Sequence, residues 1–441
     1  MNTVTFKPSE HCGKIKPLHA VNNGPIKAGS DQTRGNFPEY KAAGIPFARN
    51  HDASFCSTYG GSHSVDVNNI FTDFSRDVDD PDAYDFTLTD IYTQTILESG
   101  AQVFYRLGAA IEHSVKKYNT LPPKDFKKWA QICEHIIRHY NEGWANGFEW
   151  NIQYWEIWNE PDLDWAADNT APTPTWGGTK EQFFDLYEIT AKHLKSCFPN
   201  LKIGGPALAG QEGWAADFLA EMNKRNVPMD FFSWHAYPNV PEKMFSMAER
   251  IKALMDKNGY GNAESILNEW NYVKGWTDDF VYTIERIISI KGAAFTAACI
   301  LGSQYTSIDM LMYYDARPSA FNGLFDFYTL RPIKGYYAVS LFNELYKAGT
   351  QIACDNENDG VYALGAADGN GAVKLMIACF TDDDTVTESR KIKIKVEGMK
   401  NTEFKRFLVD SDTNEEIEPI MLDADGCAIV EMKQNSFMLL S

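Results

Sequence analysis

Short apolar runs alternate with longer amphipathic stretches between residues 17 and 346, and this rhythm constrains the fold more than any other feature. Such alternation is typical of βα units that build a parallel sheet. The expected strands are residues 18–22, 45–50, 101–106, 152–158, 202–205, 230–235, 265–269 and 308–314. Eight parallel strands are the number that closes a (β/α)8, or TIM, barrel. The sequence therefore predicts an α/β fold with a (β/α)8 TIM barrel over residues 17–346.

Amphipathic stretches between these runs predict the helices of the barrel. In residues 124–140, apolar side chains such as Trp129, Cys133 and Ile136 recur at intervals of three and four, which indicates one buried helical face. Similar patterns predict helices at residues 182–196, 214–225, 242–257 and 333–346. The connections 51–85 and 162–179 are longer than a barrel requires. Both follow the C-terminal end of an expected strand, where barrels carry their active sites, so we expect them to shape a substrate pocket.

The pattern changes after residue 350 to short alternating runs separated by clusters of Asp, Asn and Gly. Examples are residues 360–366, 372–380, 390–396 and 404–409. This pattern predicts a C-terminal antiparallel β-sandwich domain over residues 350–441. The first six residues also alternate, so the segment 1–16 can contribute a strand to that domain.

Composition excludes several classes of protein. A formal net charge of -19 argues against nucleic acid or an anionic membrane as a partner. The 8 cysteines lie singly along the chain and the histidines do not cluster, so we expect no catalytic metal and no other cofactor. No signal-peptide core and no apolar stretch of membrane-spanning length occurs, so a cytoplasmic protein is expected. The oligomeric state stays open, and a homo-oligomer is compatible with the sequence.

Two of the expected strands end in a glutamate. The fourth runs into Trp158-Asn-Glu-Pro161, which places Glu160 at a corner of the chain, and the seventh ends in Glu269. Glycoside hydrolysis needs two carboxyl groups that face each other across a sugar, about 5 to 5.5 Å apart in retaining enzymes and roughly 6.5 to 9.5 Å apart in inverting ones. Trp158 and Pro161 flank Glu160, whereas asparagines flank Glu269. We therefore expect Glu160 to be the protonated member of the pair.

Four motifs together resemble the clan of retaining (β/α)8 glycoside hydrolases, and within it family 39. They are Glu156-Ile-Trp-Asn-Glu-Pro-Asp-Leu163, Phe232-Ser-Trp-His-Ala-Tyr-Pro238, Leu267-Asn-Glu-Trp-Asn271 and Pro332-Ile-Lys-Gly-Tyr-Tyr-Ala-Val339. The resemblance extends over essentially the whole chain. It implies a double-displacement mechanism with Glu160 as acid/base and Glu269 as nucleophile. It also implies that Asn159, His235 and Tyr237 line the subsite of the cleaved sugar.

Other residues bear on the identity of the sugar. His51, in Arg49-Asn-His-Asp52, matches a histidine that members of the family place beside the sugar ring, although it can also simply pack under the loop that follows. At strand eight, xylosidase-type members carry a Trp followed by an acidic pair. Here Tyr314 can replace the Trp as a platform, but no acidic pair follows. Arg49 and Arg106 are expected to be interior partners of Glu156, because an unpaired buried charge is prohibitive.

Trp165, Trp176 and Trp276 fall in expected rim loops, where each can either stack on a sugar or pin its loop to the barrel. The leading interpretation is a retaining, exo-acting, β-xylosidase-like enzyme that acts on oligosaccharides. An α-L-arabinofuranosidase, or another specificity of family 39, shares the mechanism and differs in the pocket. A non-catalytic carbohydrate-binding barrel is the alternative from a different class.

Overall fold

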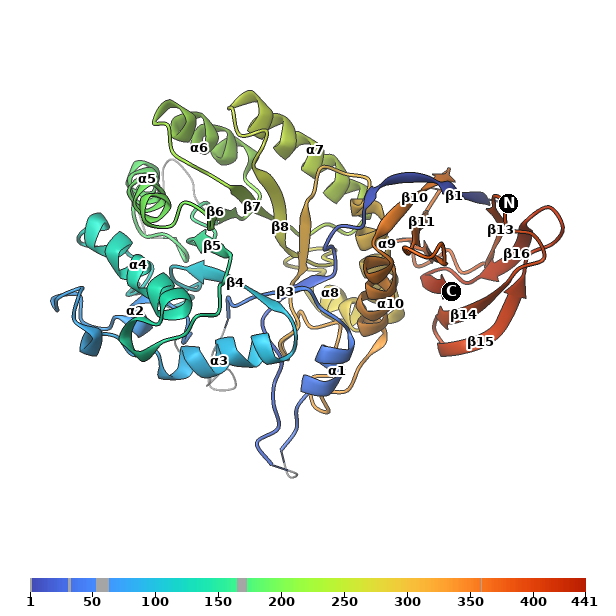
Figure 1. The fold of residues 1–441 in the computed structure, drawn as a ribbon, viewed down its shortest axis with the longest axis horizontal. Coiled ribbons are helices and arrows are strands. Elements are labelled where there is room, and N and C mark those ends of the chain that lie inside the picture. Colours follow the sequence, from blue (N-terminus) through green and yellow to red (C-terminus); the bar gives the residue numbers. More distant parts are fainter. Residues whose placement is uncertain (1, 31–32, 53–62, 165–172, 358) are drawn as a thin grey trace.

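A closed barrel of eight parallel strands lies inside a ring of helices, and a second sheet lies at one end of the molecule (Figure 1). The computed structural model describes residues 2–30, 33–52, 63–164, 173–357 and 359–441. The barrel strands are β2 (Ala20–Asn22), β3 (Phe47–Arg49), β4 (Gln102–Leu107), β5 (Tyr154–Ile157), β6 (Lys202–Leu208), β7 (Phe231–Ala236), β8 (Glu264–Trp270) and β9 (Met310–Tyr313). Each of the eight predicted strands overlaps one of these, so the predicted barrel is confirmed.

Helices surround the barrel. They are α1 (Phe37–Ala42), α2 (Val67–Ile70), α3 (Thr87–Glu98), α4 (Phe126–Glu142), α5 (Lys180–Cys197), α6 (Glu212–Lys224), α7 (Pro241–Lys257), α8 (Phe280–Ile287), α9 (Ile290–Ser303) and α10 (Lys334–Ala348), with short 3-10 turns at Pro81–Ala83 and Trp144–Asn146. The five predicted helices correspond to α4, α5, α6, α7 and α10. Their ends follow local chemistry: the side chain of Asp125 caps α4, Gly143 ends it in a left-handed conformation, and Thr179 begins α5 with a capping box. None of the helices in the described ranges is both long and apolar enough to span a membrane.

A second sheet of nine strands follows the barrel, in the order β15-β14-β17-β12-β11-β10-β1-β13-β16. Its strands are β1 (Asn2–Lys14), β10 (Thr350–Asn356), β11 (Val361–Ala367), β12 (Val373–Cys379), β13 (Arg390–Val396), β14 (Glu403–Val409), β15 (Asn414–Met421), β16 (Cys427–Met432) and β17 (Ser436–Leu440). The sheet is mostly antiparallel, but β1 runs parallel to β13. Phe404 and Ile420 from one end of the strand order share a buried cluster with Ile392 and Val430 from the other, so the sheet closes over its own core.

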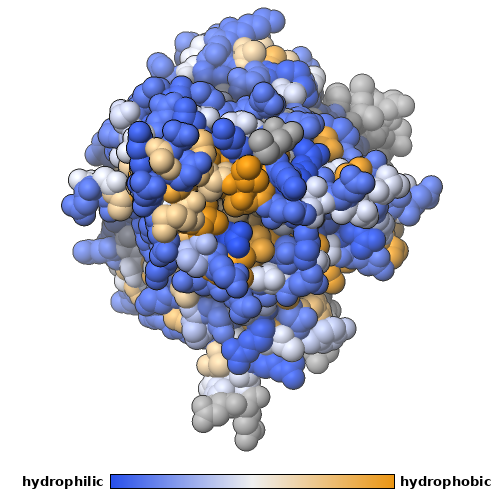
Figure 2. Space-filling view, turned by 90° about the vertical axis from the view of Figure 1, so that its right-hand side faces the viewer, coloured by the Kyte–Doolittle hydropathy of each residue, from blue (hydrophilic) through white to orange (hydrophobic). Residues whose placement is uncertain are grey.

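Helices α9 and α10 join the barrel to this sheet, where they pack against β11 and β12. Side chains of the sheet such as Leu364, Met376 and Phe380 belong to the same buried cluster as the barrel helices. Because α9 is covered on all sides, it is buried along nearly its whole length. The outer surface at the sheet end of the molecule is largely hydrophilic, with a few hydrophobic residues grouped near its middle (Figure 2).

Candidate active site

A sharp corner at the end of β5 presents Asn159 and Glu160. Trp158 and Glu160 have backbone φ angles of 75° and 49°, in a region that residues other than glycine rarely adopt. The corner is held because Trp158 Nε1 donates to the carbonyl of Thr175 at 2.8 Å, and the Glu160 backbone N–H donates to the carbonyl of Ala207 at 2.9 Å. Backbone strain of this kind persists where surrounding contacts fix it and often marks a functional site.

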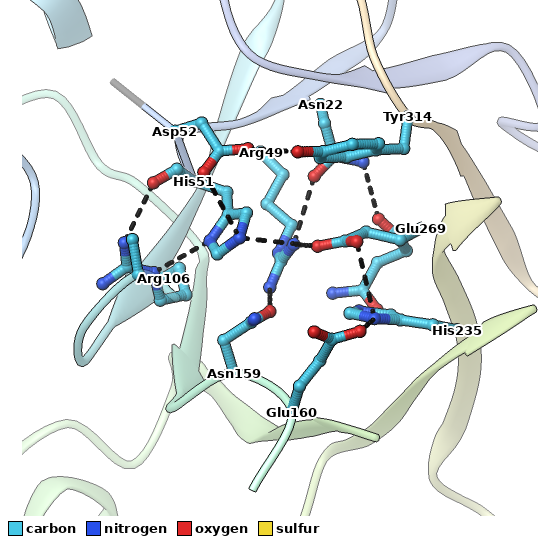
Figure 3. A network of polar contacts seen from close by, with 12 residues as sticks. Asn22, Arg49, His51, Asp52, Arg106, Asn159, Glu160, His235, Glu269 and Tyr314 are labelled. Atoms are coloured by element: carbon cyan, nitrogen blue, oxygen red, sulfur yellow. Dashed lines mark hydrogen bonds and ion pairs between the residues drawn. The ribbon is translucent and has the colours of Figure 1, made fainter. Parts of the chain in front are cut away.

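Glu160, His235 and Glu269 converge above the barrel from three strands (Figure 3). His235 on β7 and Glu269 on β8 are partners in the register of neighbouring parallel strands. The Nδ1 atom of His235 lies 2.7 Å from Glu160 Oε1 and 3.5 Å from Glu269 Oε2. One oxygen of the Glu160 carboxyl lies within 4.8 Å of one oxygen of the Glu269 carboxyl. The two glutamates that the sequence singles out are therefore neighbours.

Arg49, at the end of β3, is a buried cation at the floor of this site. Its Nε donates to Glu156 Oε2 at 2.7 Å, and its Nη1 donates to Glu269 Oε1 at 2.6 Å. Its Nη2 donates to Asn159 Oδ1 at 2.6 Å. Burial alone would lower the pKa of Arg49, but the two carboxylates raise it above its usual value. Arg49 therefore stays charged and positions both Glu269 and Asn159.

Burial is the main cause that raises the pKa of both Glu160 and Glu269, to about 7 in each case, and Arg49 opposes the rise. Direct contacts give the two carboxyl groups different preferences for the protonated form. Glu269 accepts hydrogen bonds from Arg49 and from the Tyr237 hydroxyl at 2.8 Å, and both contacts favour its carboxylate form. Among the described residues no cation donates a hydrogen bond to Glu160, which instead contacts neutral His235, whose pKa burial lowers to about 4. A proton shared within this pair is therefore better placed on Glu160.

His51 and Tyr314 border the same site on its other side (Figure 3). His51 Nε2 lies 3.6 Å from Glu269 Oε1, and the Tyr314 hydroxyl donates to Asp52 Oδ2 at 2.7 Å. Burial alone would raise the pKa of Asp52, but His51, Arg317 and the Tyr314 hydroxyl hold it below its usual value. After β9, the rim of the site is thus formed by Tyr314, whose hydroxyl contacts the Asp52 carboxylate that follows β3.

One predicted ion pair is wrong. Arg49 pairs with Glu156 as expected, but Arg106 Nη2 donates to Asp66 Oδ1 at 2.5 Å and its Nε donates to His51 Nδ1 at 3.1 Å. The reason is that Glu156 is already satisfied by Arg49 and by other donors from the barrel. Arg106 therefore supports His51, and so acts on the site through that side chain.

The three tryptophans expected at the rim differ in position and exposure. Trp176 is 1% exposed and packs edge-on against Trp158, so it pins its loop to the barrel. Trp276 is 57% exposed, and its ring lies 5.3 Å from that of Tyr237, whose hydroxyl contacts Glu269. Trp165 lies outside the described residues. Trp276 is therefore the tryptophan of this group that can meet a ligand at the mouth of the site.

Sequence reasoning missed Asp52 and Asn22 as parts of the site. Asn22, at the end of β2, accepts from Arg49 Nη1 at 3.1 Å and donates to the carbonyl of Asn268 at 2.7 Å. Asp52 contacts Tyr314 across a separation of 262 positions. The available signal was a polar residue at the C-terminal end of a barrel strand, which by itself is common.

Two groups of side chains in the described ranges have spacings that could suit a metal ion. Glu160, His235 and Glu269 form the first, but Arg49 already places a positive charge 2.6 Å from Glu269, which disfavours a second cation. The second group lies on α4 and α5 and includes Glu134, which is already paired with Arg138. The absence of a catalytic metal stays a prediction.

Known proteins match this chain in sequence and in fold. The family described as Glycosyl hydrolases family 39 matches residues 58–416. A β-xylosidase of Geobacillus stearothermophilus is 28% identical over 326 residues, covering 64% of this chain and 61% of that protein. A β-xylosidase of Caldicellulosiruptor saccharolyticus is 25% identical over 352 residues, covering 72% of this chain and 68% of that protein.

A solved structure agrees with the barrel and the second sheet. A glucosidase from Croceicoccus marinus has a TM-score of 0.79 at 21% identity, covering 100% of this chain and 98% of that one. At this identity the likeness concerns the fold alone. The aligned part of the chain spans about three fifths of the Geobacillus relative. Because the family match extends over most of the chain, this protein belongs to glycosyl hydrolases family 39.

Proposed function

We propose that this protein is a retaining glycoside hydrolase in which Glu269 is the nucleophile and Glu160 is the general acid/base. The observation that carries the proposal is the approach of the two carboxyl groups, whose oxygens come within 4.8 Å of each other. Retaining enzymes hold these groups about 5 to 5.5 Å apart, whereas inverting enzymes leave roughly 6.5 to 9.5 Å for a water molecule. The spacing therefore favours direct attack by a carboxylate.

In the first step, a Glu269 oxygen forms a bond to the anomeric carbon while the bond from that carbon to the leaving oxygen breaks. Glu160 gives its proton to the leaving oxygen. In the second step, Glu160 takes a proton from water, whose oxygen attacks the anomeric carbon and releases Glu269. His235 holds Glu160 Oε1 when its Nδ1 carries the ring proton, which leaves Oε2 to carry the transferred proton.

Asn159 fits the role of a sugar-binding amide. Arg49 donates to its Oδ1, which fixes the amide plane and leaves Nδ2 as the donor toward a sugar hydroxyl. Hydrogen bonds to the hydroxyl next to the anomeric carbon strengthen as positive charge develops in the transition state. His51 and Tyr314 complete the proposed subsite, with Tyr237 holding Glu269.

The leading substrate is a terminal β-xyloside of an oligosaccharide, released in an exo-acting manner, because the two relatives described above are β-xylosidases. An α-L-arabinofuranoside is the alternative with the same mechanism. The rim after β9 favours a test of both, because this chain has Tyr314 over Asp52 where xylosidase-type members carry a Trp followed by an acidic pair. A binding protein without turnover is the alternative of a different class.

A panel of aryl glycosides tests this proposal. We expect hydrolysis of the nitrophenyl β-D-xyloside, with the α-L-arabinofuranoside and β-D-glucoside as competing substrates. The first product, observed by NMR before it mutarotates, should keep the anomeric configuration of the substrate. Tight sugar binding with no turnover of any glycoside would support the binding protein, and a product of opposite configuration would contradict the retaining mechanism.

The pH dependence of kcat/KM should be bell-shaped, because Glu269 must be ionised and Glu160 protonated. With the pKa of Glu160 raised to about 7, activity should fall as pH rises through about 7 and Glu160 loses its proton. It should also fall on the acid side, where Glu269 gains a proton. Glu160→Gln, measured with a dinitrophenyl glycoside that needs no acid for its departure, should lack the alkaline limb. An alkaline limb that persists in this variant would contradict the assignment.

Trp276 is expected to stack on bound substrate at the mouth of the site. Trp276→Ala should raise KM about fivefold with little change in kcat, because an aromatic contact is worth about 1 kcal/mol. Trp276→Phe keeps a flat ring and serves as the matched control, with a KM close to that of the unmodified enzyme. Equal KM values for the alanine and phenylalanine variants would contradict stacking of the Trp276 ring on the substrate.

A further inference from the structure

The loop between β12 and β13 reaches from the second sheet to the barrel and inserts a carboxylate there. Asp382, in this loop, is only 11% exposed at its side chain. Its Oδ2 accepts from Asn239 Nδ2 at 2.6 Å, and its Oδ1 accepts from the Tyr272 hydroxyl at 2.6 Å. Lys274 also donates to this carboxylate. One side chain of the sheet is thus bonded to three residues of the barrel.

These three partners lie on the segments that follow β7, which carries His235, and β8, which carries Glu269. Asn239 is two residues beyond Tyr237, whose hydroxyl holds Glu269. Tyr272 is three residues beyond Glu269, and Lys274 is two residues before Trp276. Asp382 therefore ties together the two segments that carry a contact to the nucleophile and an aromatic side chain at the mouth.

The backbone joins the same two segments at one point, where the N–H of Val273 donates to the carbonyl of Pro238 at 3.1 Å. Side-chain bonds to Asp382 lie beside this single backbone contact and connect it to the sheet. The sheet is itself fixed to the barrel through α9 and α10, which lie between the two in Figure 1. The loop is thus anchored to the barrel as well as to the sheet.

The residues around Asp382 favour its charged form. Burial alone would raise the pKa of Asp382, but hydrogen bonds from Lys274, Tyr272 and Asn239 and the nearby Lys291 hold it below its usual value. Lys291 is itself buried, and its Nζ donates to the backbone carbonyl of Asp382 at 2.6 Å. Asp382 therefore remains a carboxylate through the pH range in which Glu160 and Glu269 titrate.

We propose that Asp382 is a positioning residue of the active site, through which the C-terminal sheet keeps Tyr237 against Glu269 and Trp276 at the mouth. This inference rests on the proposed function for its kinetic consequences, but not for its structural ones. Misplacement of a catalytic contact by about 1 Å can cost a factor of about 100 in rate, so a support of this kind has a measurable effect.

The same loop offers a matched control. Asp384 is 53% exposed at its side chain, and it accepts hydrogen bonds from Lys291 Nζ at 2.8 Å and from the Tyr282 hydroxyl at 2.6 Å. Those two residues lie on α9 and α8, outside the segments that follow β7 and β8, although Lys291 also donates to the backbone carbonyl of Asp382. Asp384→Asn weakens the contact between sheet and barrel but leaves Asp382 bonded to Asn239, Tyr272 and Lys274.

Hydrogen exchange and kinetics on the full-length Asp382→Asn and Asp384→Asn proteins test the inference. Asp382→Asn should speed amide exchange in residues 237–243 and 270–278, lower kcat/KM at least about tenfold, and move the acid limb of the pH profile to higher pH, because Tyr237 no longer supports the Glu269 carboxylate. Asp384→Asn should leave exchange in these segments unchanged and kcat/KM within about twofold.

A double-variant cycle with Tyr237→Phe identifies the route of the effect. Once the Tyr237 hydroxyl is absent, Asp382→Asn should shift the acid limb no further. Equal kinetic losses in the two aspartate variants, in proportion to their thermal midpoints, would overturn the inference and leave Asp382 as a structural contact. Faster exchange in Asp382→Asn, in a protein that hydrolyses no glycoside, would sustain the support and overturn the proposed function instead.

Discussion

Glu269→Ala should lower the rate of glycoside hydrolysis by on the order of 10⁵-fold, because it removes the proposed nucleophile. The variant should still fold, since Arg49 keeps its partner Glu156 and its contact to Asn159. Circular dichroism and the thermal midpoint check the fold, and steady-state kinetics with aryl glycosides check the rate. Residual turnover above about one per cent would contradict the role of Glu269 as nucleophile.

An added small anion separates the two glutamates. In Glu269→Ala, azide can occupy the space of the lost carboxylate and attack the anomeric carbon, which gives a glycosyl azide of inverted configuration. In Glu160→Ala, Glu269 still forms the intermediate, so azide should give a product of retained configuration. Glu160→Ala should also lose far more activity with a poor leaving group than with dinitrophenol, since the latter needs no proton. The same configuration from both variants would contradict the division of roles.

Arg49→Met should have the second large effect, on both stability and activity. It leaves Glu156 buried without its cation, and breaking a buried pair by removing one partner costs about 3–5 kcal/mol. It also releases Glu269 and Asn159, so hydrolysis should be lost. The thermal midpoint and the kinetics of the purified variant measure the two effects.

The double variant Arg49→Met/Glu156→Gln distinguishes folding from catalysis. Replacing Glu156 by its neutral amide removes the unpaired buried charge, and Ser233 and Asn268 can still donate to the remaining oxygen. The thermal midpoint should therefore recover, whereas activity should not, because Glu269 still lacks its cation. Recovery of activity together with stability would mean that Arg49 has only a structural role.

Local patterns predicted the fold well because they report which face of each segment is buried. The alternation of apolar runs located all eight barrel strands, and helices such as α4 have one apolar face that repeats at helical spacing. Helix α9 gave no such signal, because it lies between the barrel and the second sheet and is buried on all sides. The parallel pairing of β1 with β13 joins segments about 390 positions apart, which local patterns cannot reveal.

Strand ends pointed to Glu160 and Glu269, because a parallel barrel brings the C-terminal ends of its strands to one face. The partners of these residues could not be read in the same way. Arg49 was expected to pair with Glu156, but its contacts to Glu269 and Asn159 depend on the barrel geometry. Asp382 lies in a loop between two strands of the second sheet, more than 100 positions from the barrel segments that it contacts.

Covalent trapping tests the two-carboxylate account most directly. A 2-deoxy-2-fluoro glycoside with a good leaving group forms the first intermediate but breaks it down slowly, since the fluorine destabilises both transition states. Mass spectrometry of the inactivated protein and of its peptides should find one sugar per chain, attached to Glu269, and Glu160→Gln should still be labelled when the leaving group is dinitrophenol. Label on another residue, or time-independent inhibition with no adduct in a protein that turns over substrate, would contradict the retaining mechanism proposed for Glu160 and Glu269.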